Sequence, residues 1–313
     1  MSSTLSPSDR ERLAAEFFRQ IPPNYADVGI NESLLMFSGK DSLTRLEVLS
    51  SKLPAHVKEI GGVLKGFTPV PNAVGLGAYL IATFLEYYAW GKESSLKSIL
   101  GSILEEEKAS EVWNLMEEYL KRYEMHLWND GTLLKETQRL ERQLSLQLTR
   151  LRNFMDKQIN SRAVKRWVNG ATFHVQMLIQ IARLSKSTGQ GTQAFEGAKK
   201  AASRAVITYR NDWIKIQNKY REFKTSALTI SERCSYTTGR CPAPPPPPGC
   251  RFEESEIKFH CFISYHTKMS PGYYVDYIFE NHKQLKEIND YFSNLEKNID
   301  DLASQTGDFQ IKH

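Results

Sequence analysis

The sequence predicts a mainly α-helical protein, an elongated bundle of long helices with a small β-rich hairpin inserted near residues 228–270. Apolar residues recur every three or four positions along most of the chain, which is the period of a helix. Several of these stretches are longer than 20 residues, which suits helices packed lengthwise. Strands and helices do not alternate along the sequence, so a doubly wound α/β fold is not expected.

Composition is that of a globular chain. Of 313 residues, 41% are apolar and 25% are charged, which excludes a mainly disordered protein. Four Cys are too few for a scaffold built on disulfides. The first residues, MSSTLSPSDRERLAAEFFRQIPP, lack the basic start and apolar run of a secretory signal, so the cytoplasm is the expected default location.

We expect three parts: a helical bundle over residues 1–227, a Cys- and Pro-rich hairpin over 228–270, and a C-terminal helix over 271–313 that packs back on the bundle. Within the bundle, an early helix spans 43–64, with Asp41 as its N-cap and Pro54 as a kink. The next begins near Ser94 and ends at Asn129–Gly131.

Four further helices carry clear apolar stripes. Their stripes are Leu140, Leu144, Leu148, Leu151, Met155 and Ile159 in 133–159; Phe173, Met177, Ile181 and Leu184 in 163–184; Ala202, Val206, Tyr209, Trp213, Ile216, Tyr220, Phe223 and Ala227 in the next; and Leu285, Ile288, Phe292, Leu295, Ile299 and Leu302 in 274–302. A loop at Ser185–Gly191 separates the helix at 163–184 from the helix that carries the stripe beginning at Ala202.

An uncharged segment, Gly66–Leu85 (GFTPVPNAVGLGAYLIATFL), precedes these helices, and its apolar helix is expected over 73–90. It is short for a stable membrane span, and an aromatic cluster suited to a lipid–water interface follows it. A buried core helix, a segment that inserts conditionally and a permanent span are the alternatives. The candidates for membrane insertion are Val74, Leu76, Tyr79, Leu80, Ile81, Phe84, Leu85, Tyr88 and Trp90.

A Gly-containing apolar helix among long amphipathic helices resembles the layout of α-helical pore-forming toxins, such as hemolysin E and the N-terminal domain of delta-endotoxins. It is also similar to the rapunzel family of fish proteins, in which an early apolar segment precedes a long leucine-striped helix. The resemblance covers Leu43 to Leu184 and lies in the pattern, so no functional residue is carried over. It implies a protein that is soluble until triggered, and then inserts its apolar helix into lipid as an oligomer.

The hairpin contains all four cysteines, Cys234, Cys241, Cys250 and Cys261. Strands are expected at 227–230 and 256–265, and the pairs Cys241–Cys250 and Cys234–Cys261 would suit such a hairpin. Oxidised cysteines would imply release from the cell by a non-classical route, because cytosolic thiols stay reduced. Free thiols are one alternative, and zinc with His260 or His266 is another, although the Cys spacing lacks a compact zinc pair.

Five prolines, Pro244 to Pro248, form the tip of the hairpin. They should adopt a polyproline helix, either as a stiff loop or as a ligand for a polyproline-binding domain.

Charge is unevenly distributed. Residues 133–224 carry 19 Lys and Arg against 6 Asp and Glu, whereas the rest of the chain carries 22 against 30. Either these basic helices pack beside acidic ones, or they form a face for anionic lipid or nucleic acid.

The sequence contains no phosphate-binding, dinucleotide-binding, nucleophile-elbow or zinc-protease motif. We therefore expect no enzyme activity, no small-molecule substrate, no cofactor and no metal. His174 is expected to be a packed helix residue. The favoured function is that of a membrane-acting, pore-forming-like protein; the alternative is a helical scaffold that binds other proteins.

Overall fold

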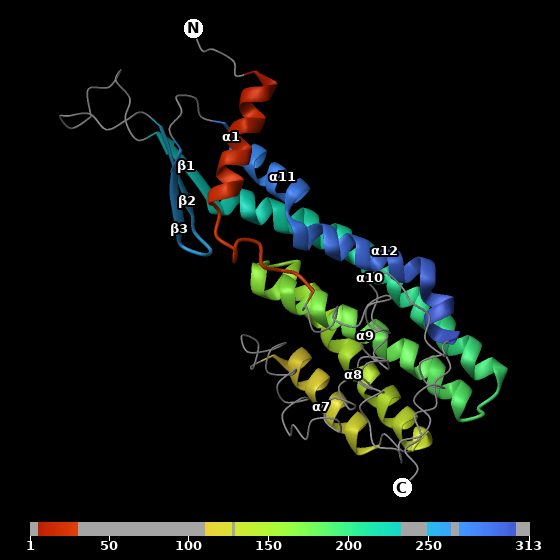
Figure 1. Ribbon diagram of the computed structural model, residues 1–313. Coiled ribbons are helices and arrows are strands. Elements are labelled where there is room, and N and C mark those ends of the chain that lie inside the picture. The colour runs from red at the N-terminus through yellow and green to blue at the C-terminus, as the bar shows by residue number, and fades with distance from the viewer. Residues whose placement is uncertain (1–5, 31–109, 127–128, 233–248, 264–268, 305–313) are drawn as a thin grey trace, which may run out of the picture.

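The computed structural model describes residues 6–30, 110–126, 129–232, 249–263 and 269–304. Within them the protein is a helical bundle with a small antiparallel sheet at one end (Figure 1). The helices are α1 (Pro7–Gln20), α7 (Glu111–Met125), α8 (Asp130–Met155), α9 (Ser161–Ser187), α10 (Thr192–Ala227), α11 (Pro271–Asn281) and α12 (Lys283–Ser304). The strands are β1 (Leu228–Glu232), β2 (Cys250–Glu254) and β3 (Phe259–Ile263). The predicted fold class is confirmed.

Helix α9 occupies the centre of the bundle and packs against α7, α8, α10 and α12. The predicted stripe of Phe173, Met177, Ile181 and Leu184 is buried, and the other sides of this helix are buried as well over residues 167–185. One of its buried polar side chains pairs with a neighbouring helix: Gln176 donates to the hydroxyl of Tyr291 on α12 at 2.9 Å. The stripes predicted for α10 and α12 are buried as expected, apart from the half-buried Phe223.

Asparagine caps separate α7, α8 and α9. The side chain of Asn129 accepts a hydrogen bond from the Thr132 amide, and that of Asn160 accepts one from the Ala163 amide. The prediction that Asn129–Gly131 ends a helix was therefore wrong, because α7 ends at Met125 and Asn129 begins α8. Residues 94–109 of that predicted helix, and the helix at 43–64, lie outside the described residues.

The predicted C-terminal helix is two helices. His282 has an extended backbone between α11 and α12, with φ −71° and ψ 122°. This break places Gln284, near the start of α12, where its side-chain oxygen accepts hydrogen bonds from the amides of Val28 and Gly29, both at 3.1 Å. The segment after α1 is thereby fastened to α12, a connection that periodicity alone does not predict.

The sheet has the order β1-β2-β3, so β2 lies between the two strands that were expected to pair. The expected strand at 256–265 is also shorter, because a turn at 255–258 precedes β3. Phe252 on β2 stacks on Phe17 of α1, with ring centroids 4.7 Å apart, and covers the hydrophobic side of the sheet. Helix α1 was not predicted, although Ser6 before Pro7 is a recognisable helix start.

A largely buried ion cluster joins α10 to the sheet. The ammonium of Lys224 lies 3.1 Å from Glu254 and 2.8 Å from Glu256. It also lies 4.2 Å from the centre of the Tyr25 ring, a cation–π contact. Ser161, the first residue of α9, donates through its backbone amide to Glu256 at 2.7 Å. The cluster therefore connects α9, α10, the sheet and the segment after α1.

Candidate functional site

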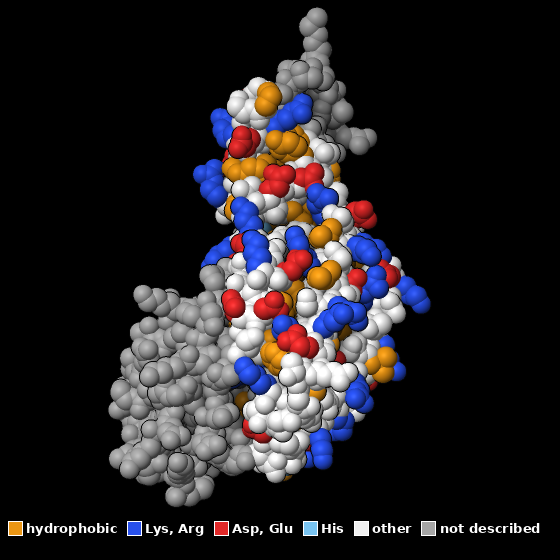
Figure 2. All heavy atoms as spheres, turned by 90° about the vertical axis from the view of Figure 1, so that its right-hand side faces the viewer, with side chains coloured by type: hydrophobic (Ala, Val, Ile, Leu, Met, Phe, Trp, Pro, Cys, Tyr) orange, Lys and Arg blue, Asp and Glu red, His pale blue; other side chains and the backbone are white. Residues whose placement is uncertain are grey.

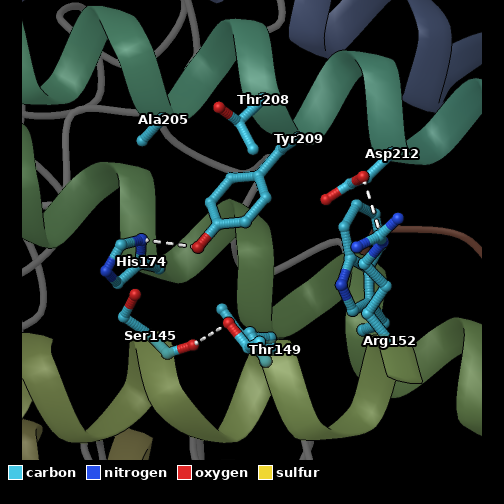
Figure 3. A pocket seen from close by; sticks show the side chains of 10 residues that line it. Ser145, Thr149, Arg152, His174, Ala205, Thr208, Tyr209 and Asp212 are labelled. Atoms are coloured by element: carbon cyan, nitrogen blue, oxygen red, sulfur yellow. Dashed lines mark hydrogen bonds and ion pairs between the residues drawn. The ribbon is translucent and has the colours of Figure 1, made fainter. Parts of the chain in front are cut away.

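Helices α8 and α10 both pack on α9, and a groove of about 320 Å³ opens between them. Figure 3 shows this groove, with α10 above, α8 below and side chains from all three helices in its lining. It lies inside the segment 133–224, whose positive charge is the main functional signal of the sequence.

Small side chains explain why the groove exists. Ser145 and Thr149 lie one turn apart on α8, and Ala205 and Thr208 lie one turn apart on α10. Bulky residues at these positions would fill the space between the helices, as side chains do elsewhere in a close-packed core. These small residues are visible in the sequence, but only the packing of α8 and α10 on α9 shows that they line a groove.

A hydrogen-bonded chain of three side chains forms one wall of the groove. The hydroxyl of Tyr209 lies 2.9 Å from Nδ1 of His174, and Nε2 of His174 lies 2.8 Å from Oε1 of Glu141. A carboxylate can only accept, so Nε2 donates to Glu141, and in the neutral imidazole Nδ1 then accepts from the phenol. His174 is buried in α9 as expected, but its link between α8 and α10 was not predicted.

The hydrogen-bonded side chains hold Tyr209 in place and do not make its phenol reactive. Burial raises the pKa of Tyr209 well above its ordinary value, and the charges of Glu141 and Asp212 raise it further. The phenol therefore stays protonated and acts as a fixed hydrogen-bond donor. The arrangement fixes the side chain of Tyr209 and offers no nucleophile there.

An ion pair between Arg152 of α8 and Asp212 of α10 closes one end of the groove, with Arg152 Nε 3.1 Å from Asp212 Oδ1 (Figure 3). Among the described residues, no partner binds the two terminal nitrogens of Arg152. Burial raises the pKa of Asp212 above its ordinary value, although Arg152 and Lys215 oppose the shift. The carboxylate is thus only partly stabilised by its partner.

Basic side chains surround the mouth of the groove. Arg142 lies three residues before Ser145 on α8, and Arg204 and Lys215 lie four residues before and seven after Thr208 on α10. Helical spacing places them on the sides that border the groove. We call Arg142, Arg152, Arg204 and Lys215 the groove rim. Among the described residues that line the groove, Asp212 is the one carboxylate, and Glu141 reaches the lining through its hydrogen bond with His174.

The packing of basic helices beside acidic ones accounts for part of the charge, and a face for anionic lipid or nucleic acid stays a prediction. Twelve of the 19 Lys and Arg in 133–224 are exposed. Some pair with acidic residues of the C-terminal helices, as Arg210 does with Glu296. Nine of the twelve make no ion pair with any described carboxylate: Lys135, Arg142, Arg150, Lys157, Arg162, Lys186, Lys200, Arg204 and Lys215. In the view of Figure 2, Lys and Arg side chains are spread over the visible face, with isolated hydrophobic groups between them.

The cysteine prediction needs correction. Cys250 on β2 and Cys261 on β3 are thiols, so neither predicted disulfide is present. The prediction assumed a two-stranded hairpin, whereas β2 separates β1 from β3 and keeps the expected partner strands apart. Cys234 and Cys241 lie outside the described residues. Burial and the charge of Glu16 raise the pKa of Cys261 to about 11.

Several predicted site residues cannot be placed. The membrane-insertion candidates between Val74 and Trp90 lie outside the described residues, as do Pro244 to Pro248. Of the helices that are described, none has the length and apolar character to cross a membrane. In the same part of the chain, no group of three or more His, Cys, Asp and Glu is arranged to hold a metal ion.

Comparison of the chain with protein-family models, curated proteins and solved structures gave no match.

Proposed function

We propose that the protein attaches to anionic membranes through the groove rim and the neighbouring basic residues, and then inserts its apolar segment 73–90. The observation that supports attachment is the set of nine exposed basic side chains without a described carboxylate partner. Basic side chains that make no ion pair within the protein can attract an anionic surface.

Exposed apolar side chains on the same two helices add to this argument. Leu146 and Phe154 on α8, and Ile207 and Ile214 on α10, are between 43% and 51% exposed. Apolar groups among cations favour the boundary between lipid headgroups and acyl chains. Single exposed hydrophobic residues are common on soluble proteins, so the charge carries the proposal and the apolar residues support it.

Attachment has a sufficient driving force. A basic residue held near an anionic membrane contributes about 1 kcal/mol before screening, so the three rim residues without a described carboxylate partner contribute about 3 kcal/mol together. Insertion rests on the sequence of 73–90 and on the resemblance to helical pore-forming toxins. It also requires the bundle to open, which its stability opposes. We therefore expect attachment to be easier to observe than leakage.

The test compares two variants with the same change in charge. Arg142→Gln/Arg204→Gln/Lys215→Gln neutralises three residues of the groove rim, and Arg10→Gln/Arg19→Gln/Lys258→Gln neutralises three exposed residues on α1 and the β2–β3 turn. Binding to phosphatidylserine-containing vesicles is measured by sedimentation at low and high salt. The rim variant should bind about 100-fold more weakly than the native protein at low salt, and the control close to normally.

Equal loss in both variants would show that net charge, and not the groove rim, determines binding. If the native protein binds no vesicle at low salt, the membrane proposal is wrong and the scaffold alternative remains. Dye release from the same vesicles tests insertion. Binding without release at any protein concentration would limit the function to peripheral attachment.

A further inference from the structure

We infer that the groove between α8 and α10 is a binding site for a phosphate ester, with the phosphate at Arg152. The organic part of the ester, here called the stem, lies along the groove. This goes beyond attachment through surface charge, because it assigns a specific pocket and ligand class. It stands independently of membrane binding, since a soluble phosphate ester presents the same chemistry as a lipid headgroup.

The donor for the phosphate is the guanidinium of Arg152. Its ion pair with Asp212 uses Nε and holds the side chain in place. The two terminal nitrogens therefore remain available to a ligand in a fixed position. A guanidinium binds phosphate oxygens with two parallel hydrogen bonds, a geometry that an ammonium cannot reproduce. The other residues of the groove rim make the potential at the mouth positive and favour an anion over a cation.

The rest of the groove lining determines the length and the chemistry of the stem that would fit. Ser145 lies seven residues before Arg152 on α8, so the groove extends about 10 Å from the guanidinium. A bare phosphate would occupy only one end of a cavity of about 320 Å³. The lining includes the apolar residues Leu148 and Trp167 and the hydroxyl-bearing residues Ser145, Thr149 and Thr208. A short stem with both apolar and hydroxyl groups, such as glycerol, matches this lining.

Two of those hydroxyls already have partners, which restricts their role. Thr149 donates to the Ser145 carbonyl at 3.0 Å, and Thr208 donates to the Arg204 carbonyl at 2.8 Å. Their oxygens remain able to accept hydrogen bonds from hydroxyls of the stem. They therefore suit a polyol better than a second anionic group, which would need donors.

Asp212 provides a distinctive signature. Its carboxylate competes with the phosphate for Arg152 and repels it. Removing that charge in Asp212→Asn should tighten phosphate binding, whereas removing the guanidinium in Arg152→Gln should weaken it. General damage to the fold would weaken binding in both variants, so opposite effects distinguish a binding site from a structural ion pair.

The experiment is a calorimetric titration of the full chain with glycerol 3-phosphate, with inorganic phosphate and glycerol as separate probes. We expect glycerol 3-phosphate to bind more tightly than either part, Arg152→Gln to weaken it at least about tenfold, and Asp212→Asn to strengthen it. Ala205→Leu, which fills the groove without changing charge, should also remove binding. Arg150→Gln, which removes a neighbouring exposed guanidinium that does not line the groove, is the matched control and should bind normally.

If the native protein shows no heat with glycerol 3-phosphate, or if Ala205→Leu binds as well as the native protein, the site is not the groove. The double variant Arg152→Gln/Asp212→Asn guards against misfolding, because it leaves no unpaired charge; normal binding by this variant would also overturn the inference. The source of the phosphate is decided by vesicles containing phosphatidic acid. Weaker vesicle binding by Arg152→Gln than by Arg150→Gln identifies a headgroup, and equal vesicle binding with loss of glycerol 3-phosphate identifies a soluble ester. Loss of vesicle binding by the rim variant alone would leave this inference intact.

Discussion

The ammonium of Lys224 on α10 lies 3.1 Å from the carboxylate of Glu254 on β2, and both side chains are completely buried. A buried pair of this kind is expensive to break, because the remaining charge has neither water nor a partner.

We therefore expect Lys224→Met to lower the free energy of unfolding by about 3–5 kcal/mol. Lys219→Met is the control, because its ion pair with Asp156 is on the surface and should contribute at most about 1 kcal/mol. Urea unfolding measures both. Similar midpoints for the two variants would show that the buried cluster does not stabilise the fold.

Acid should weaken the same cluster. Burial raises the pKa of Glu256, but hydrogen bonds from Lys224 and Ser161 lower it more, so the net pKa lies below its ordinary 4.5. When folding lowers the pKa of a carboxyl group, that group stabilises the folded state at pH values above its pKa in the unfolded chain. This stability is lost as the pH falls through the pKa in the folded state. Glu256→Gln should thus be less stable than the native protein at pH 6 and lose less stability between pH 5 and pH 3. Parallel stability curves over that range would contradict the assignment.

Two glycines should respond in opposite directions to alanine. A Cβ at Gly170 on α9 would lie 2.7 Å from Leu148 and 2.7 Å from Val112, where three helices meet. Gly170→Ala should cost about 1–3 kcal/mol through overpacking. At Gly197 on α10 no atom lies within 4 Å of the new Cβ, so Gly197→Ala should stabilise by about 0.5–1 kcal/mol. Thermal unfolding of both variants checks the prediction, and it fails if Gly170→Ala melts at or above the native temperature.

The hydrogen-bonded chain at the groove can be measured through Tyr209→Phe. This change removes the hydroxyl but leaves the ring, and Nδ1 of the buried His174 loses its partner. We expect a loss of about 1–3 kcal/mol in stability. Thr208→Val is the control, since its hydroxyl only bonds to the backbone of its own exposed turn. A neutral effect of Tyr209→Phe would mean that water replaces the phenol.

Cys261 should react slowly in the folded protein. With its pKa raised to about 11, little thiolate exists at pH 7.5, and the side chain is half-buried. Iodoacetamide should label Cys261 much faster after denaturation, as peptide mass spectrometry can show. Protein isolated without reductant should also contain Cys261 as a thiol. Recovery of a Cys261 disulfide from such protein would contradict the structure.

The helical part of the fold was predictable because the buried stripes are long and regular. The spacing from Ala202 to Tyr220 identifies α10, and that from Leu285 to Leu302 identifies α12. The sheet was harder, because β2 contains only five residues and follows a cysteine- and proline-rich stretch of sequence. The break at His282 accompanies the hydrogen bonds from Val28 and Gly29 to Gln284, which join segments far apart in the sequence.

The groove was not predictable from the sequence. Ser145, Thr149, Ala205 and Thr208 are ordinary residues for the surface of a helix, and they form a cavity only because α8 and α10 lie on either side of α9. Likewise, Glu141, His174 and Tyr209 belong to three helices and have no common motif. The excess of positive charge in 133–224 was the one signal in the sequence that pointed to this region.

The contact between Phe17 of α1 and Phe252 of β2 joins parts of the chain that are 235 residues apart. During synthesis, α8, α9 and α10 emerge consecutively and can pack through contacts between neighbouring segments. Among the described elements, α1 packs against β2, β3 and α11, which all follow α10 in the chain. Of the described segments, those that cover the apolar side of α1 are therefore translated only after the central helices of the bundle.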